Sequence, residues 1–571
     1  MTTFVKRLCT LLLTGAMALL IVTLAPATAN AQRGKGTRFC KELFNPNLNP
    51  NGRIFASQGA QMYCFGFQLN SASKRPQVLA IPSGIKNVDA ANPSEDISPN
   101  GTQAYGQSET SIAAADQYVV EAWNDSTGFF SPCPSPNSKE ELTGFGFSNN
   151  GGASFTDLGG LPNNNCATSR FEGDPSVEAF EFQGAHYFYI TSIFVNLTTG
   201  AGDIGLTACE VAGFGFSASL SCGQPIIVAV GRTPFSFLDK DFATIDPLRG
   251  KLYVSYTDFG FDPITLLSTN EIDLAACDLT FNPMVPVCSN GSSVAPAPPY
   301  IMVAATDANF CENEGAYPAA DVSTGDVYVA YEHNWPSVFA FGACLTDPTK
   351  EVASYIPHSC LSFPSSSCLT GPFVTAAQLV TSESGAFIPG YNRFPMNDFP
   401  RIAVSSPQGT VSIVWNDARF KPTGVILLQS WLTGGAFPAP VQLEPVVVDK
   451  AAKAGQGWQF LPGMRNTDDD GNLYISWYGR TKPDTAVTNV YEAVGVSPRT
   501  TATPSNIKIT NVASDWNAIS SDIIPNFGDY TDNYVGAVGN FGPPFTGEID
   551  YTAWSDGRLG DPQPFEAHIT H

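Results

Sequence analysis

The sequence predicts an all-β protein, a β-propeller of four-stranded antiparallel blades, on three observations. Charged residues make up 14 % of the 571 residues, whereas Gly (51), Pro (44) and aromatic residues (12 %) are abundant, which is typical of turn-rich β proteins. One hairpin pattern recurs along the chain. Each interval between copies holds two further strand-like runs, so the repeating unit has four strands, as a propeller blade does.

The hairpin consists of a short apolar strand, a turn rich in Gly, Asp, Ser or Pro, and a β-branched and aromatic strand that usually closes on Trp or Tyr. Seven copies are found, at 109–125, 174–192, 241–258, 316–333, 398–419, 460–480 and 529–558. They predict seven blades. Six blades is the alternative if 174–192 or 460–480 is not a full blade, and a stack of sandwich domains is a third interpretation.

The ends of the repeat predict how the ring closes. The last copy has room for three strands, so we expect the segment before the first copy to supply the fourth, at 77–82. The expected organisation is a signal peptide at 1–31, an N-terminal disulfide-pinned arm at 32–100 that contributes the ring-closing strand, and the β-propeller at 101–571.

The N-terminus has the three parts of a secretory signal. Lys6 and Arg7 precede a largely apolar stretch at 8–25, and Ala29 to Ala31 form an A-x-A cleavage site. A lone membrane anchor is the competing interpretation. No second apolar stretch is long enough to span a bilayer, so we expect no membrane contact after cleavage and a secreted protein, extracellular or periplasmic.

Cysteine usage agrees with export. Once Cys9 leaves with the signal, an even number remains, which predicts disulfides. Consecutive pairing would close short loops such as Cys209–Cys222 and Cys277–Cys288. The spacings are not C-x-x-C, which argues against a metal site. The remaining cysteines are Cys40, Cys64, Cys133, Cys166, Cys209, Cys222, Cys277, Cys288, Cys311, Cys344, Cys360 and Cys368.

The net charge of −23 argues against a nucleic-acid partner, because the chain lacks the basic surface that replaces phosphate counterions. We expect a monomer whose partner is an extracellular glycan or protein.

A short motif adds a family resemblance. Ser148 to Phe155 (SNNGGASF) matches the Asp-box pattern S-x-D-x-G-x-[ST]-[WF] with Asn150 in the Asp position, and Ser430 to Phe437 (SWLTGGAF) is a fainter copy. Together with the hairpins, the chain resembles the Asp-box (BNR-repeat) sialidase-like β-propellers over about residues 100–571. The motif is a structural turn, so the resemblance implies a fold, with a ligand site at the channel mouth opposite the Asp boxes.

Acidic residues recur where the innermost strands begin, and these starts lie together at one mouth of the central channel. The candidate binding residues there are Glu109, Asp174, Asp241, Asp398, Arg465 and Asp529. The structural alternative is that the acids tie the innermost strands together by accepting hydrogen bonds from backbone N–H groups.

A sialidase-type site, as the resemblance implies, has three arginines for a carboxylate, a Tyr nucleophile with a Glu base, and an Asp acid. This chain has no F-R-I-P stretch in its first blade and no spacing that marks a Tyr–Glu pair. Glu314, Tyr317 and Arg401 are the candidate catalytic residues. Two functions therefore compete: a non-catalytic binding module that uses the acidic mouth, and an exo-sialidase-like glycoside hydrolase acting on acidic sugars.

One stretch has the spacing of a calcium loop. Asn466, Asp468, Asp470 and Gly471 match the start of an EF-hand, but Trp477 stands where the loop needs Glu. We expect a β-turn, with Ca²⁺ as the minority alternative, and no other cofactor.

Overall fold

The computed structural model describes residues 79–80, 84–96, 106–129, 142–198, 200–231, 236–261, 268–288, 301–305, 311–336, 350–362, 372–378, 388–391, 399–417, 421, 423–433, 441–442, 446–449, 457–519, 521, 526–537 and 548–570. These residues form six hydrogen-bonded β-sheets. In the part of the chain that the structure describes, no helix is long and apolar enough to cross a membrane.

The first sheets in the chain have the strand orders β3-β4-β5-β6 and, in a larger sheet, β16-β15-β14-β13-β10-β9-β7 with β8, β11, β12 and β17 alongside. The larger sheet holds two antiparallel units joined by a single parallel pair between β10 and β13. Their bounds are β3 (Gln107–Ala115), β4 (Tyr118–Asp125), β5 (Thr143–Ser148), β6 (Thr156–Gly160), β7 (Ser169–Phe171), β8 (Ser176–Phe182), β9 (Ala185–Asn196), β10 (Gly202–Ala212), β11 (Ser219–Cys222), β12 (Ile226–Ala229), β13 (Phe237–Asp246), β14 (Lys251–Phe261), β15 (Ser268–Asp278), β16 (Val287–Cys288) and β17 (Ile301–Ala304).

Four further sheets follow, with the orders β18-β19-β20-β21, β22-β23-β24-β25 with β26, β1-β31-β29-β28-β27 with β30, and β2-β34-β33-β32. Their bounds are β18 (Cys311–Ala320), β19 (Val327–Pro336), β20 (Lys350–Ile356), β21 (Pro372–Gln378), β22 (Arg401–Ser405), β23 (Thr410–Asp417), β24 (Val425–Leu432), β25 (Val441–Gln442), β26 (Val446–Val447), β27 (Gln459–Gly463), β28 (Leu473–Gly479), β29 (Val487–Val496), β30 (Asn506–Lys508), β31 (Val512–Asp515), β1 (Leu79–Ala80), β32 (Asp532–Ala537), β33 (Glu548–Asp556), β34 (Gln563–Thr570) and β2 (Val88–Asp89). The helical turns are η1 (Ser126–Phe129), η2 (Gly215–Ser217) and α6 (His358–Ser362).

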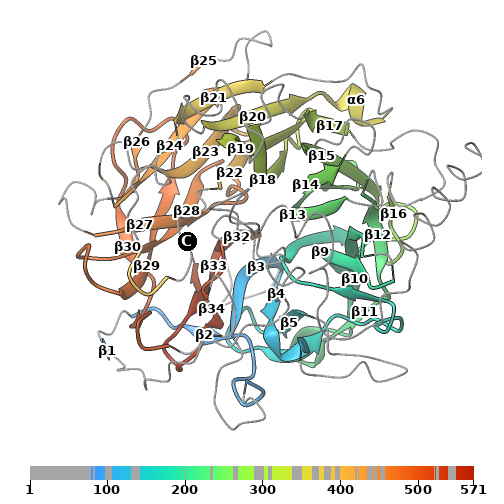
Figure 1. Ribbon diagram of the computed structural model, residues 1–571, viewed down its shortest axis with the longest axis horizontal. Coiled ribbons are helices and arrows are strands. Elements are labelled where there is room, and N and C mark those ends of the chain that lie inside the picture. Colours follow the sequence, from blue (N-terminus) through green and yellow to red (C-terminus); the bar gives the residue numbers. More distant parts are fainter. Residues whose placement is uncertain are drawn as a thin grey trace, which may run out of the picture.

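The sheets are arranged around a common centre, with β3, β13, β18, β22 and β32 near it (Figure 1). β3 contacts β8 and β32, β13 contacts β8 and β18, and β18 contacts β22. β27 contacts β32 as well as β23 and β24 of the preceding sheet. We call this series of contacts the circuit; in it β22 is linked to β27 through its partner strand β23.

All seven expected hairpins are antiparallel strand pairs, β3–β4, β8–β9, β13–β14, β18–β19, β22–β23, β27–β28 and β32–β33. Their closing aromatics are buried between neighbouring sheets, and the acid two residues further on has a specific role. The indole Nε1 of Trp415 donates to Asp417 Oδ2 at 3.1 Å, and that of Trp554 donates to Asp556 Oδ2 at 2.8 Å. In these two copies the W-x-D pattern thus satisfies an indole donor that burial would otherwise leave unpaired, whereas the indole nitrogen of Trp123 does not bond Asp125 in this way.

The first and last parts of the described chain meet in one sheet, but not through the segment that the sequence indicated. Val88 and Asp89 of β2 pair with Glu566 and Phe565 of β34. Leu79 and Ala80, the described part of 77–82, instead pair with β31 of the preceding sheet. The apolar run at 77–82 was the wrong choice, because β34 accepts a strand of only two residues, too short to have an apolar pattern of its own.

The Ser148–Phe155 motif lies between β5 and β6. Ser148 Oγ accepts from the backbone N–H of Gly152 at 2.9 Å, and Asn150 Oδ1 accepts from that of Ser154 at 3.0 Å. Phe155 packs against the cluster that contains Tyr551 of β33. Side-chain oxygens therefore close this turn, and its aromatic residue joins the first sheet to the last one.

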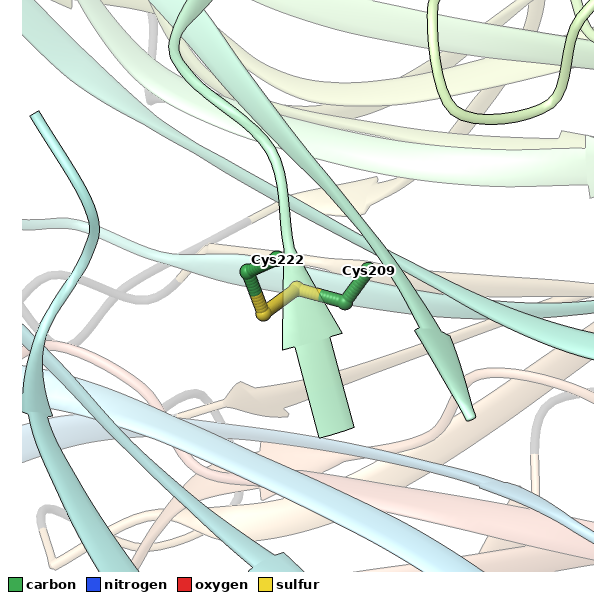
Figure 2. Close-up of a disulfide and its surroundings, with 2 residues drawn as sticks. All are labelled: Cys209 and Cys222. Carbon is green, nitrogen blue, oxygen red and sulfur yellow. A yellow bond between two sulfur atoms is a disulfide. The ribbon is translucent and has the colours of Figure 1, made fainter. Parts of the chain in front are cut away.

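Two of the expected disulfides are formed, Cys209–Cys222 (Figure 2) and Cys277–Cys288, and each joins directly opposite residues of a third-to-fourth-strand hairpin. Cys166 and Cys360 are also disulfide-bonded.

Candidate functional site

Polar side chains gather at two levels along the centre of the circuit. A buried ion cluster, formed by Glu109, Asp174, Lys240 and Asp529, lies where the innermost strands begin. An open cavity, which we call the axial cavity, lies where these strands end. Arginine and tyrosine side chains fill the space between the two.

Lys240 of β13 is the centre of the ion cluster. Its side chain is fully buried, and Nζ lies 2.9 Å from Asp529 Oδ2, 3.1 Å from Asp174 Oδ2 and 3.6 Å from Glu109 Oε1. The ring of Tyr530 lies 5.1 Å from the same nitrogen. One cation therefore connects carboxylates from the first, second and last hairpins.

The backbone at these positions is left-handed. Glu109, Asp174 and Lys240 have φ values of 57°, 55° and 52°, and two comparable positions are occupied by Gly315 and Gly528, at 69° and 72°. Non-glycine residues adopt this conformation at a cost in energy that the surrounding contacts must offset. The ion cluster supplies those contacts.

The two carboxyl groups that face each other differ in protonation. Burial, followed by the charge of Asp174, raises the pKa of Glu109 well above its usual value. Burial also acts to raise the pKa of Asp174, but the charge of Lys240 and a hydrogen bond with Glu109 hold that pKa below its usual value. The two shifts have opposite directions, which favours the proton on Glu109 and the charge on Asp174.

Three of the acids expected at the channel mouth, Glu109, Asp174 and Asp529, thus come together, but they are buried rather than open to a ligand. Asp241 is buried beside them, and burial raises its pKa well above the usual value. Asp398 lies outside the described residues. Arg465 belongs to the opposite end of the innermost strands, on the floor of the axial cavity.

Arg401 and Tyr317 fill the layer between the ion cluster and the cavity. The guanidinium carbon of Arg401 lies 4.9 Å from the ring centre of Tyr317, 5.0 Å from that of Phe242 and 5.6 Å from that of Tyr530. Burial lowers the pKa of Arg401. Stacking against aromatic rings offsets part of the cost of burying this cation.

Tyr317 is poorly suited to act as a nucleophile. Its hydroxyl accepts a hydrogen bond from Arg465 Nε at 3.0 Å and donates to Asp532 Oδ1 at 3.4 Å. Burial raises the pKa of Tyr317, although Arg465 acts in the opposite direction. Glu314, the one carboxylic acid among the three candidate catalytic residues, lies beyond the β18 bulge, opposite Glu332 of β19.

Arg465 is held rigidly by the protein. One terminal nitrogen donates to Ser111 Oγ and Ser176 Oγ, at 3.1 Å each, and ion-pairs with Asp532 Oδ2 at 2.9 Å. The other donates to the Val177 carbonyl and lies 3.3 Å from Glu178 Oε1. These contacts, from β3, β8 and β32, fix the guanidinium plane at the cavity floor.

The axial cavity has a volume of about 580 Å³. Its wall is formed by β3, β8, β13, β18, β22 and β32, by the turns next to them, and by the segment 465–469 after β27. Polar groups such as Glu178 and Asn466 alternate with the rings of Phe180 and Tyr534. Burial raises the pKa of Glu178 to about 8, although Arg465 lowers it.

The calcium candidates at this rim already have protein partners. Asn466 bonds the backbone of Val535 through both amide atoms, at 2.8 Å each. Asp468 accepts from the Asn472 backbone at 2.6 Å and from Tyr474 at 3.1 Å, which closes the turn before β28. Within the described ranges, no group of three or more His, Cys, Asp or Glu side chains is placed to hold a metal ion. Asp470 therefore does not belong to such a group.

Lys240 was not found from the sequence. Alignment of the hairpins placed Asp241 at the conspicuous acidic position, whereas the bulge between Asp239 and Phe242 turns the preceding residue inward. The signal in the sequence was that Lys240 is basic at the position where the first two copies have the acids Glu109 and Asp174.

No protein-family model and no curated protein sequence matches the chain. Among solved structures, it is similar to an α-L-arabinofuranosidase from Fusarium graminearum (11 % identity, 71 % of this chain and 94 % of that one, TM-score 0.37). It is also similar to an α-L-arabinanase from Penicillium chrysogenum (10 %, 72 % and 95 %, 0.32) and to the Trypanosoma rangeli sialidase (8 %, 86 % and 60 %, 0.33). A sialidase is thus among the solved structures to which this chain is similar.

Proposed function

We propose that this chain is a secreted β-propeller of seven four-stranded blades that binds a glycan in the axial cavity without catalysing a reaction. The seven hairpins and the circuit of their innermost strands support the blade count, and the pairing of β2 with β34 supports ring closure. The signal-like segment at 1–31 and the two hairpin disulfides support export.

The observation that carries the binding function is the cavity itself. Its volume of about 580 Å³ is in the usual range for ligand pockets, about 300–1,000 Å³. A saccharide presents hydroxyl groups and apolar C–H faces. Exposed acceptors on Glu181 and Asp469 at the rim suit the hydroxyl groups, and the partly exposed ring of Tyr534 suits the C–H faces. The mouth acids are a weaker choice, because Glu109, Asp174 and Asp529 are buried around Lys240 and closed to a ligand.

One observation favours the alternative, a glycoside hydrolase. Glycosidases use one protonated and one ionised carboxyl group, and Glu109 and Asp174 are held in those states side by side. Their burial against Lys240 argues for a structural role instead.

Binding is tested by calorimetry with the purified mature chain and a panel of neutral and acidic oligosaccharides. Ala179 lines the cavity, so Ala179→Trp should fill it and abolish binding. Ala153 is exposed on the turn after β5, and Ala153→Trp is the matched control that should bind normally. Equal binding by both variants would show that the ligand binds outside the cavity.

Catalysis is tested with fluorogenic glycosides, sialosides included. We expect no turnover. Turnover that is lost in both Glu109→Gln and Asp174→Asn would establish the hydrolase and place its site at the ion cluster.

A further inference from the structure

Large apolar side chains are exposed mainly in one part of the described surface. Six of the seven that stand out belong to the β8–β17 region, and the seventh is Leu559, in the β33–β34 turn. The six are Phe214, Phe216, Leu248, Phe281, Val285 and Val287. We call the two hairpin ends that carry most of them tip 1 (residues 210–221) and tip 2 (residues 278–287).

Tip 1 is the turn between β10 and β11, closed at its base by the Cys209–Cys222 disulfide (Figure 2). Its backbone is anchored to the neighbouring first sheet. The Gly215 N–H donates to Tyr118 Oη at 3.1 Å, and Asn149 Nδ2 donates to the Phe216 carbonyl at 2.9 Å. The rings of Phe214 and Phe216 are nevertheless 87 % and 72 % exposed. The chain holds this turn in place while leaving its aromatic rings in solvent.

Tip 2 repeats the arrangement in the next unit. The Cys277–Cys288 disulfide closes it, and side chains fix its turns: Asp278 accepts from the Thr280 N–H at 2.9 Å, and Asn282 accepts from the Met284 N–H at 3.1 Å. Phe281 between these turns is 90 % exposed. A rigid presentation of exposed rings lowers the entropy that a partner must offset on binding.

The two tips are neighbours and lead toward the axial cavity. β12, which follows tip 1, contacts β16 at the base of tip 2. The Leu279 N–H of tip 2 donates to the Gly250 carbonyl in the β13–β14 turn at 3.0 Å. That turn carries exposed Leu248 beside Pro247, which lines the cavity. The β13–β14 turn therefore contacts tip 2 and also borders the cavity.

Charge indicates what kind of partner this surface fits. Tips 1 and 2 carry one charged side chain each, Glu210 and Asp278, next to the disulfides, and the residues between carry none, although the chain as a whole has a net charge of −23. A bilayer would have to approach the whole end of the molecule, where Glu181 and Asp469 are exposed at the cavity rim. A second copy would bring two strongly negative chains together. A linear uncharged polymer meets the tips without either cost.

We propose that tips 1 and 2 form an accessory surface that binds a neutral polysaccharide, with sugar rings stacked on Phe214, Phe216 and Phe281. This inference rests on the proposed glycan-binding function and extends it from a short ligand in the cavity to a polymer that also crosses the rim. Two modest contacts on one polymer reinforce each other, because the second becomes intramolecular.

The test measures retention of the full mature chain on microcrystalline cellulose and on chitin, with polygalacturonate as the anionic comparison. The variant F214S/F216S/F281S should lose about tenfold or more in affinity for a neutral polymer, equivalent to roughly 1.4 kcal/mol. Leu559→Ser, an exposed apolar residue away from the tips, is the matched control and should bind like the native chain. Because all four residues are exposed, thermal melting should be unchanged in both variants.

Equal retention of the triple variant and the native chain would overturn the proposal. So would flotation with phosphatidylcholine vesicles, or dimerisation, that depends on the three rings in a chain that no neutral polymer retains. The cavity variant Ala179→Trp separates this proposal from the previous one. If Ala179→Trp is retained like the native chain, and if the native chain binds no soluble oligosaccharide, the cavity function is refuted and the polymer-binding role of the tips stands.

Discussion

Asp96 lies fully buried where the N-terminal segment meets the first and last described sheets, and Asp96→Asn should stabilise the protein at neutral and alkaline pH. The Asp96 carboxyl accepts hydrogen bonds from Gln107 Nε2 at 2.7 Å and Gln563 Nε2 at 2.6 Å. Burial, followed by the charges of Asp561 and Asp125, raises the pKa of Asp96 from 3.8 to about 9.

The sign follows from the two states of the chain. The unfolded chain releases the Asp96 proton above about pH 4, while the folded chain keeps it up to about pH 9. The contribution of Asp96 to stability is therefore complete below pH 4 and is lost as the pH rises toward 9. At about 1.36 kcal/mol per pH unit, the free energy of unfolding falls by roughly 5 kcal/mol between pH 4 and pH 8.

Asparagine avoids this loss because it carries no proton to release. Its amide keeps one acceptor, and its N–H₂ group can meet the buried Oε1 of Gln107 or Gln563, which has no hydrogen-bond partner among the described residues. The entropy of unfolding is about 2.1 cal/mol/K per residue, or roughly 1.2 kcal/mol/K for 571 residues. A gain of about 5 kcal/mol then raises Tm by about 4 °C.

The assay is differential scanning calorimetry of the native chain and Asp96→Asn from pH 4 to pH 8. We expect equal Tm values at pH 4 and a difference that grows with pH. Glu95→Gln alters the adjacent exposed acid and is the matched control, with no growing difference. A gap between Asp96→Asn and the native chain that is the same at both pH values would refute the reasoning.

Three further expectations concern buried charges and a covalent bond. Lys240→Met leaves three buried carboxyl groups without their cation and should cost about 3–5 kcal/mol, with a larger fall in Tm at pH 8 than at pH 5; an unchanged Tm would contradict the ion-cluster geometry. Replacing Cys209 and Cys222 by serine opens a loop with a sequence separation of 13 and should cost about 3 kcal/mol in urea unfolding, and reductant should then have a smaller effect than on the native chain. Burial raises the pKa of both Glu492 and Asp550, which face each other. Glu492→Gln should therefore reduce the loss of Tm between pH 5 and pH 8, and an unaltered dependence of Tm on pH would count against a shared proton.

The hairpins could be predicted from the sequence because each is a local pattern. Strand period, turn residues and a closing aromatic occur within about 20 residues, as in 398–419, where β22 and β23 form. The disulfides Cys209–Cys222 and Cys277–Cys288 were accessible for the same reason, since each closes one hairpin.

The candidate site could not be predicted to the same extent, because it depends on contacts between distant hairpins. Bulges shift the register at the start of β3, β13, β18 and β27, so the residue that turns inward cannot be read from alignment. Lys240 was missed in this way. Arg465 was identified but assigned to the wrong end of the channel, because it lies after β27 and reaches across to Glu178 and Asp532.

The pairing of β2 with β34 can form only after the last strand of the chain has been synthesised. Asp96 and Gln563, which bond each other beside that pair, lie 467 residues apart. At synthesis rates of about 5–20 residues per second, the last sheet is produced roughly 25 to 90 s after the first. Throughout that interval the apolar face of β3 at Ile112 and Ala114 lacks the cover that Ile549 and Tyr551 later give it. The first sheet therefore gains its full cover only after the last one is made, and until then its apolar face is available for aggregation.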